Sequence, residues 1–269
     1  DAEAIENFRR IDTLIVDKTG TLTEGKPAFR QAVGIGEYAE DEVLRIAASL
    51  DQNSEHPLAD AIVAEARRRN LALETPEHFE SSTGIGVRGV VGGRKVVIGT
   101  RELMREVGVD PAPLREAADA LRRDGASVML LAVDGALAGL LAVADPIKAS
   151  TPDAIAALHA AGLRIVMATG DGVATAQAVA RQLGIDEVYG EVRPQDKVEL
   201  VQRLKAEGRK VAMAGDGIND APALAAADVG IAMGGGTDVA MHAAGITLMR
   251  GDPRLVAAAL DISRRTYNK

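Results

Sequence analysis

The 269-residue sequence contains no cysteine and no tryptophan, and its aromatic side chains are limited to three Phe and three Tyr. Without cysteine the chain can form no disulfide, no thiolate metal site and no cysteine nucleophile. The four histidines are scattered rather than spaced as a ligand cluster: His56, His78, His159 and His242. We therefore expect no transition-metal site in this chain.

Basic residues are in deficit, because 31 Lys and Arg stand against 39 Asp and Glu, which gives a formal net charge of −8. A protein that binds the phosphate backbone of nucleic acid needs a basic face. We therefore expect no nucleic-acid partner.

Long apolar runs are also missing. The longest, residues 128–144, is interrupted by Asp134-Gly135, falls short of the roughly 20 apolar residues of a membrane-spanning helix, and instead predicts two strands around a turn. The first residues lack the basic start and apolar stretch of a signal peptide. We expect a soluble fragment with no membrane-spanning segment.

The apolar residues that are present fall into short runs that alternate with stretches of helical spacing, which predicts an α/β protein. Near-continuous apolar strands end in glycine turns at 164–171, 210–217 and 228–235. Uninterrupted apolarity is typical of strands covered on both faces. Helical spacing lies between them at 151–162, 173–184 and 194–208. This order predicts a Rossmann-like parallel sheet.

A similar strand at 13–17 is separated from that series by a region of different texture. The region combines helical patterns with alternating strands, a mixture suited to an antiparallel sheet. Its helices are expected at 41–50 and 57–70, and its strands around 87–100 and 127–143. We predict one domain of residues 1–25 and 144–269, split by an inserted α+β domain of residues 26–143.

The strand at 13–17 leads directly into Asp17-Lys18-Thr19-Gly20-Thr21-Leu22-Thr23. This order presents a carboxylate at the carboxyl edge of a parallel sheet, where open α/β sheets place their ligands. A lone aspartate at a strand end often only caps a turn, but seven residues in this order favour a functional site.

Other strand ends supply matching groups, namely Thr169-Gly170-Asp171, Lys197 in the following helix, and the segment 215–220. In a parallel sheet these loops meet at one edge. They would bring together a nucleophilic carboxylate, a hydroxyl, an ammonium and further carboxylates. This combination suits phosphoryl transfer to a carboxylate with Mg²⁺ held by acidic oxygens.

The chain is identified by three segments as a member of the P-type ATPases, within the haloacid-dehalogenase-like superfamily. The segments that resemble the phosphorylation-domain signatures are DKTGTLT (17–23), TGD (169–171) and GDGINDAPAL (215–224). SEHPLA (54–59) and TGIGVRG (83–89) resemble the nucleotide-binding domain of the heavy-metal branch. The segments 245–256 and 262–269 look most like copper pumps.

The resemblance implies that ATP phosphorylates Asp17 with Mg²⁺, and that hydrolysis of ATP to ADP and phosphate drives metal export. The implied catalytic residues are Asp17, Lys18, Thr19, Thr169, Gly170, Asp171, Lys197 and Asn219. The implied Mg²⁺ ligands are Asp17, the carbonyl of Thr19, Asp216 and Asp220. The implied nucleotide-binding residues are Asp51, His56, Gly84, Gly86 and Gly99.

Four positions depart from the common pattern of the family. Asp51 stands where Glu is common, and Thr100 stands where Asn often follows the glycine. Gly172 replaces Asn and His242 replaces Glu. The carboxylate of Asp51 is kept but is one methylene shorter, and the other three positions receive no function.

The resemblance also implies ATP as a partner, together with the actuator and transmembrane domains of a full-length pump at the cytoplasmic face of a membrane. Because the chain lacks cysteine, we expect that the transported metal does not bind here. A zinc or cadmium pump is the alternative within the branch. A haloacid-dehalogenase-type phosphatase would need a second Asp where Thr19 stands, and a non-catalytic nucleotide-binding module would not need Asp17 or Lys197.

Overall fold

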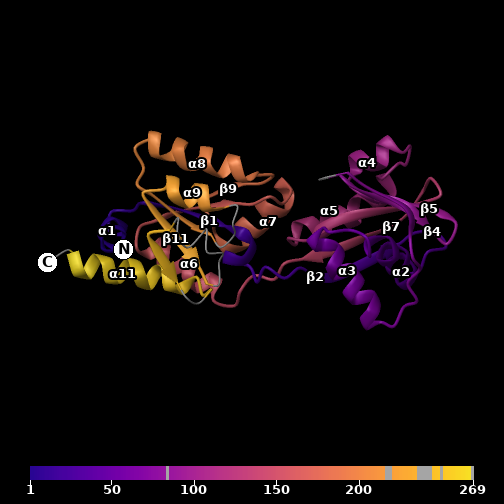
Figure 1. Ribbon diagram of the computed structural model, residues 1–269, viewed down its shortest axis with the longest axis horizontal. Coiled ribbons are helices and arrows are strands. Elements are labelled where there is room, and N and C mark those ends of the chain that lie inside the picture. The colour runs from indigo at the N-terminus through magenta and orange to yellow at the C-terminus, as the bar shows by residue number, and fades with distance from the viewer. Residues whose placement is uncertain (83–84, 216–219, 235–243, 249–250, 268–269) are drawn as a thin grey trace. The chain divides into compact units, whose positions relative to one another are not determined.

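The computed structural model describes residues 1–82, 85–215, 220–234, 244–248 and 251–267 (Figure 1). The chain forms two compact units. The first unit comprises Asp1–Lys26 and Pro146–Lys269, and the second comprises Pro27–Asp145. No helix in the described stretches is both long and apolar enough to span a bilayer.

The first unit is built around a parallel sheet of six strands, in the order β12-β11-β10-β1-β8-β9. The strands are β1 (Thr13–Asp17), β8 (Arg164–Ala168), β9 (Glu187–Tyr189), β10 (Val211–Gly215), β11 (Val229–Met233) and β12 (Ile246–Leu248). Each neighbouring pair runs parallel. All residues of β1, β10 and β11 are buried, as the uninterrupted apolar runs predict for a sheet covered on both faces.

Helices cover both faces of this sheet. They are α1 (Ala2–Phe8), α6 (Thr151–Ala160), α7 (Val173–Leu183), α8 (Pro194–Ala206), α9 (Ala221–Ala226) and α11 (Arg254–Tyr267). Leu14 belongs to the apolar cluster that includes side chains of α1, α6, α7 and α11, whereas its neighbour Ile15 belongs to the cluster of α8 and α9. In Figure 1, α8 and α9 accordingly lie on one side of the sheet, and α6 and α11 lie on the other.

The position of β1 decides where the chemistry can lie. β1 pairs with β10 on one side and with β8 on the other, and Asp17 stands beside Ala168 in the register. Because the strands are parallel, the segments that follow β1, β8 and β10 leave the sheet at the same edge. The predicted parallel α/β architecture is confirmed.

The second unit contains an antiparallel sheet in the order β2-β7-β6-β5-β4-β3. Its strands are β2 (Ala28–Gly34), β3 (Glu77–Ser82), β4 (Gly86–Val91), β5 (Arg94–Gly99), β6 (Ser127–Val133) and β7 (Ala136–Ala144). Asp134 and Gly135 join β6 to β7 with φ of 48° and 80°. Two positive φ values in a two-residue loop are typical of a tight hairpin, as the interrupted apolar run predicts.

The helices of the second unit form two pairs. They are α2 (Glu40–Asp51), α3 (Pro57–Arg68), α4 (Arg101–Glu106) and α5 (Arg115–Arg123), with a 3₁₀ turn at Ala112–Leu114. Side chains of α2 and α3 share one apolar cluster with the sheet, and side chains of α4 and α5 share another. Val96 belongs to the first cluster and its neighbour Val97 packs against the second, so the two clusters lie on opposite faces.

Candidate active site

Three separate segments of the first unit converge on the carboxyl end of β1. Asp17 ends β1, Lys197 lies in the first turns of α8, and Asp220 immediately precedes α9. The Nζ of Lys197 lies 3.3 Å from Oδ1 of Asp17 and 2.9 Å from Oδ1 of Asp220. All three side chains are buried, with 12% of Asp17 exposed. Asp17 is thus held beside an ammonium at the rim of the sheet.

The charges in this cluster do not balance, because two carboxylates share one ammonium. Burial raises the pKa of Asp17 to about 8; Lys197 opposes the shift, and the nearby carboxylate of Asp220 adds to it. Burial lowers the pKa of Lys197, but its attraction to Asp17 and Asp220 outweighs that effect and raises the pKa overall. A second positive charge at this site would therefore favour the ionised form of Asp17.

Oxygen ligands and excess negative charge suit Mg²⁺, a hard cation that binds through a few carboxylates and carbonyls. In the described part of the chain the predicted ligands are Asp17, Asp220 and the carbonyl of Thr19, while Asp216 lies outside it. No group of three acidic or histidine side chains that could hold a metal occurs among the described residues. Two carboxylates and one carbonyl do not fill the near-octahedral coordination of Mg²⁺, so this donor set fits a cation that is also bound by phosphate oxygens or water.

The loop after β1 is a tight turn over Lys18–Leu22 that requires glycine. Gly20 has a φ of 81°, in the region that favours glycine. The hydroxyl of Thr23 accepts a hydrogen bond from the Gly20 amide at 3.2 Å and donates one to the carbonyl of Lys18 at 3.1 Å. Gly20 and Thr23 of the DKTGTLT segment therefore close the loop that carries Thr19.

A second ion pair joins this loop to the end of β8. The Nζ of Lys18 lies 2.5 Å from Oδ2 of Asp171, and Lys18 is buried. The Asp171 amide donates to Oγ1 of Thr169 at 3.2 Å, and Thr169 is buried as well. A Cβ on Gly170 would meet the carbonyl of Val192 at an ordinary 3.7 Å, so packing alone does not demand glycine there. The predicted residues Lys18, Thr169 and Asp171 thus form one connected group.

In the second unit, the predicted residue His56 caps a helix. Its Nδ1 accepts a hydrogen bond from the Leu58 amide at 3.2 Å, at the N-terminus of α3. Because Nδ1 is the acceptor, the neutral ring carries its proton on Nε2. His56 is exposed, so this N–H can reach a ligand.

Asp51, the last residue of α2, is a buried carboxyl with 4% of its surface exposed. Its Oδ2 has no hydrogen-bond partner among the described residues. Burial raises the pKa of Asp51 to about 7. Buried polar atoms are nearly always paired, so this oxygen is a candidate acceptor for a ligand donor.

The predicted residues Gly86 and Gly99 face each other across β4 and β5. A Cβ on Gly86 would lie 2.1 Å from the carbonyl oxygen of Ile98, and a Cβ on Gly99 would lie 2.2 Å from that of Ile85. No side chain fits at either position without a backbone shift. Gly84 and Asn219, which were also predicted as site residues, lie outside the described residues, as does His242.

The family departure at Thr100 has a structural reason. Its Oγ1 accepts a hydrogen bond from the Leu103 amide at 3.2 Å and so caps α4. Asparagine and threonine both cap helices in this way. This role could have been predicted from a threonine placed just before a helix.

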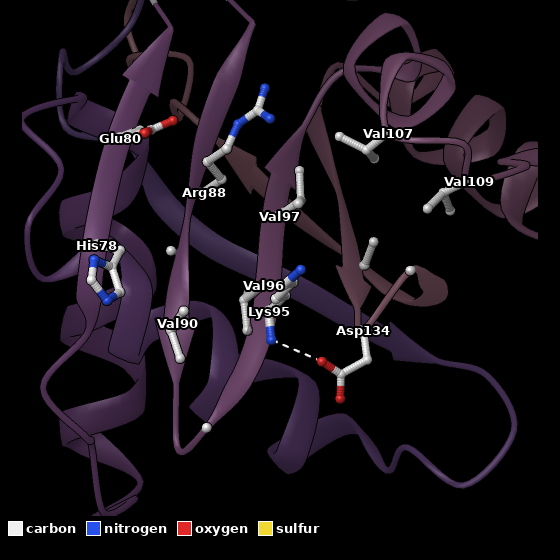
Figure 2. A pocket seen from close by; sticks show the side chains of 14 residues that line it. His78, Glu80, Arg88, Val90, Lys95, Val96, Val97, Val107, Val109 and Asp134 are labelled. Atoms are coloured by element: carbon white, nitrogen blue, oxygen red, sulfur yellow. Dashed lines mark hydrogen bonds between the residues drawn. The ribbon is translucent and has the colours of Figure 1, made fainter.

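A cleft of about 740 Å³ opens on the face of the second sheet that carries α4 and α5 (Figure 2). Its floor includes Arg88 and Val90 of β4 and Lys95 and Val97 of β5. None of the predicted nucleotide-binding residues that the structure describes lines it. The alternation of strand residues predicts that these four side chains share one face, but no sequence motif marks that face.

Comparison with known proteins gives one matching family and several similar P-type ATPases. The family described as haloacid dehalogenase-like hydrolase matches residues 11–228. A copper-transporting P-type ATPase of Rhizobium leguminosarum bv. viciae is 54% identical over 99% of this chain and 32% of its own length. A silver exporting P-type ATPase of Salmonella typhimurium is 51% identical over 98% of this chain and 32% of its own length. The chain thus spans about a third of the length of these relatives.

Two solved structures resemble the whole chain. One is the catalytic domain of the CPx-ATPase CopB-B, in a study of its conformational changes upon nucleotide binding; it is 31% identical, with a TM-score of 0.75 over 97% of this chain and 93% of that one. The other is a zinc-transporting PIB-type ATPase in the E2.Pi state; it is 36% identical, with a TM-score of 0.78 over 99% of this chain and 43% of that one.

Proposed function

The chain belongs to the haloacid dehalogenase-like hydrolases, and within them to the catalytic domains of the P-type ATPases, and we propose that it is the ATP-binding and phosphorylation unit of a heavy-metal pump. The observation that carries this proposal is the placement of Asp17 at the end of the central strand, beside Lys197 and Asp220. It supplies a nucleophile and a fixed positive charge at the edge where such sheets bind ligands.

In the proposed reaction, a carboxylate oxygen of Asp17 attacks the γ-phosphorus of ATP. The bond from phosphorus to that oxygen forms as the bond to the bridging oxygen of ADP breaks, and ADP leaves with the electron pair. Lys197 stabilises the ionised carboxylate and the negative charge on the transferred group. When bound by Asp17, Asp220, Asp216 and the carbonyl of Thr19, Mg²⁺ would supply further positive charge to the phosphate oxygens.

The remaining groups of the first unit would hold the geometry. Thr169 is proposed to contact the transferred phosphoryl group, Gly170 follows it in the same loop, and Asn219 is proposed as a supporting group that helps to position the ion, the lysine and the loops. The ion pair between Lys18 and Asp171 fixes the loops after β1 and β8 relative to each other. Positioned loops matter because phosphoryl transfer depends on alignment more than on proton transfer.

We assign nucleotide binding to the inserted region, predicted as residues 26–143. Support comes from the unpartnered carboxyl oxygen of Asp51 and from the exposed Nε2 of His56. Gly84, Gly86 and Gly99 would let the nucleotide approach the backbone, and the absence of room for a Cβ at the last two explains why they are glycine.

The phosphoenzyme is expected to persist in this chain. Thr19 stands two residues after Asp17, where a phosphatase of the same superfamily carries its second aspartate, so this position offers no general acid or base. Dephosphorylation would need the actuator domain of a full-length pump. This argues against the phosphatase alternative.

The transported ion is proposed to be copper or a similar soft cation. Relatives named for copper or silver are 44–54% identical to this chain, whereas the zinc-transporting structure is 36% identical. A zinc or cadmium pump remains the alternative. Because the chain has no cysteine, the ion would bind in the transmembrane domain rather than here. This unit would then work at the cytoplasmic face of the membrane.

The test is labelling with ATP that carries ³²P in its γ-phosphate, in the presence of Mg²⁺. The chain should acquire label that is stable in acid and released by hydroxylamine, as expected for an acyl phosphate. Asp17→Asn should abolish the label, and Asp261→Asn on the exposed face of α11 should leave it unchanged. Label that survives in Asp17→Asn would contradict the proposal.

A further inference from the structure

Lys148 joins two loops at the edge of the sheet that carries Asp17. Its Nζ donates hydrogen bonds to the carbonyl of Gly20 at 2.9 Å and to the carbonyl of Gly251 at 2.5 Å. Gly20 belongs to the loop after β1, and Gly251 lies between β12 and α11. None of the sequence motifs includes Lys148.

The backbone around Lys148 is itself fastened to the loop after β1. The Lys148 amide donates to the carbonyl of Leu22 at 3.0 Å, and Oγ1 of Thr151 donates to the same carbonyl at 2.8 Å. Thr23 forms an antiparallel bridge with Ile147. The ammonium of Lys148 therefore reaches Gly20 from a backbone that already has a fixed position.

Both peptide groups of Gly20 are held by hydrogen bonds. Oγ1 of Thr23 accepts from its amide at 3.2 Å, and Lys148 donates to its carbonyl. Together these bonds fix φ and ψ of a residue that would otherwise sample many conformations.

The first of these bonds also orients Thr19. In a trans peptide the carbonyl points opposite to the amide N–H of the next residue. Because the N–H of Gly20 points to Thr23, the carbonyl of Thr19 points away from Thr23. The conformation of Gly20 therefore controls the direction of a predicted Mg²⁺ ligand.

We propose that Lys148 is a positioning residue for the phosphoryl-transfer site, which holds Gly20 in its left-handed conformation and thereby aims the carbonyl of Thr19 at the cation. This inference rests on the proposed function for the identity of the cation. The donor set of Asp17, Asp220 and the Thr19 carbonyl fits Mg²⁺, and the role of Lys148 is to keep one of those donors in place.

The test compares Lys148→Met, which removes the donor at similar length, with Lys148→Arg, which keeps it. The matched control is Lys205→Met, because Lys205 also donates to a backbone carbonyl of the same unit, that of Ala226, at 3.0 Å. Mn²⁺ replaces Mg²⁺ as a probe, and its binding to the purified chain is followed by electron paramagnetic resonance. Amide hydrogen exchange at Gly20 provides a second readout that needs no metal.

Lys148→Met should weaken Mn²⁺ binding about 10-fold, the usual effect of removing a group that orients a metal ligand. It should also speed exchange of the Gly20 amide. Lys148→Arg should stay within about 2-fold of the wild type on both readouts, and Lys205→Met should match the wild type. Unchanged Mn²⁺ binding and exchange in Lys148→Met would overturn the inference, as would an equal loss in Lys205→Met.

If Lys148→Met fails to fold, Thr23→Val provides the second variant, because it releases the other peptide group of Gly20. It should weaken Mn²⁺ binding in the same way, and normal binding would refute the inference. A wild-type chain that binds no Mn²⁺ would refute it as well. The proposed function fails separately, through label that persists in Asp17→Asn.

Discussion

The buried carboxylates of the two units differ in whether they have a partner. In the first unit, Asp17 and Asp220 lie against Lys197, and Lys18 lies against Asp171. In the second unit, the carboxyl of Asp51 is equally buried, but its Oδ2 has no partner in the part of the chain that the structure describes. The first arrangement is built before any ligand arrives, whereas the second leaves an acceptor to be satisfied.

This difference suits the two tasks that we propose. Phosphoryl transfer needs charges fixed in advance, because preorganised groups need no rearrangement as charge develops. Nucleotide binding gains specificity from a buried acceptor, because a ligand without the matching donor leaves it unpaired. The contrast predicts that removing the partner of a buried charge lowers the stability of the first unit. It also predicts that removing the charge of Asp51 raises the stability of the second unit.

The largest effect is expected for Lys197→Met, which leaves Asp17 and Asp220 without their counter-charge. Breaking a buried ion pair on one side costs about 3–5 kcal/mol of stability. Loss of a charge that stabilises the transition state should reduce phosphoenzyme formation by about 10²- to 10³-fold. Urea unfolding and γ-phosphate labelling measure the two effects.

The matched control is Lys205→Met on the same helix. The Nζ of Lys205 lies 3.8 Å from Asp228, and 39% of the Lys205 side chain is exposed. It should change the free energy of unfolding by less than about 1 kcal/mol. Equal losses of stability in Lys197→Met and Lys205→Met would show that the buried cluster contributes no more to stability than an exposed ion pair. The first half of the comparison would then fail.

The second prediction concerns Asp51→Asn and its pH dependence. The pKa of Asp51 is about 7 in the folded chain and 3.8 in the unfolded reference. The folded state therefore holds a proton that the unfolded state loses between these values, so stability falls as pH rises from about 4 to about 7. A difference of about three pKa units corresponds to at most about 4 kcal/mol.

Asp51→Asn should remove this part of the decline and make the second unit more stable than the wild type at pH 8. Amide exchange along α2, measured at pH 5 and pH 8, follows the second unit without contributions from Asp17. If the stability of Asp51→Asn fell with rising pH at the same slope as that of the wild type, Asp51 would have a partner in solution. The contrast between the units would then disappear.

The fold could be predicted from the sequence largely where burial is uniform. The sequence predicts the apolar strands of the first unit because strands buried on both faces form uninterrupted apolar runs. It predicts the hairpin at Asp134-Gly135 because these two turn residues interrupt an apolar run. β3 was missed because nearly all of its residues are exposed, so it has no apolar alternation. β9 and β12 were missed because three residues are too few to show a period.

The site could be predicted where its residues form motifs, but not where a single side chain bridges distant loops. Asp17 and Lys197 lie together at the edge that the strand order predicts. Lys148 carries no local signal, because its role depends on the carbonyls of Gly20 and Gly251, which are distant in sequence. The structure adds a second requirement for glycine at Gly99, because a Cβ there would lie 2.2 Å from the carbonyl oxygen of Ile85, just before β4.

The smallest effect is expected at His56, where two roles must be separated. His56→Ala removes both the cap on α3 and the ring, whereas His56→Asn keeps a capping oxygen without the Nε2 donor. Loss of the cap should cost about 1 kcal/mol of stability in the alanine variant and little in the asparagine variant. Thermal unfolding measures this difference.

Isothermal titration with ATP then tests the second role. If Nε2 of His56 donates to the nucleotide, both variants should lose affinity by a similar factor of about 5 to 10, the value of one hydrogen bond. If asparagine restores both stability and affinity, His56 acts only as a cap. The second unit would then bind nucleotide without it, and Asp51 would be the stronger candidate for the polar contact that distinguishes this unit from the first.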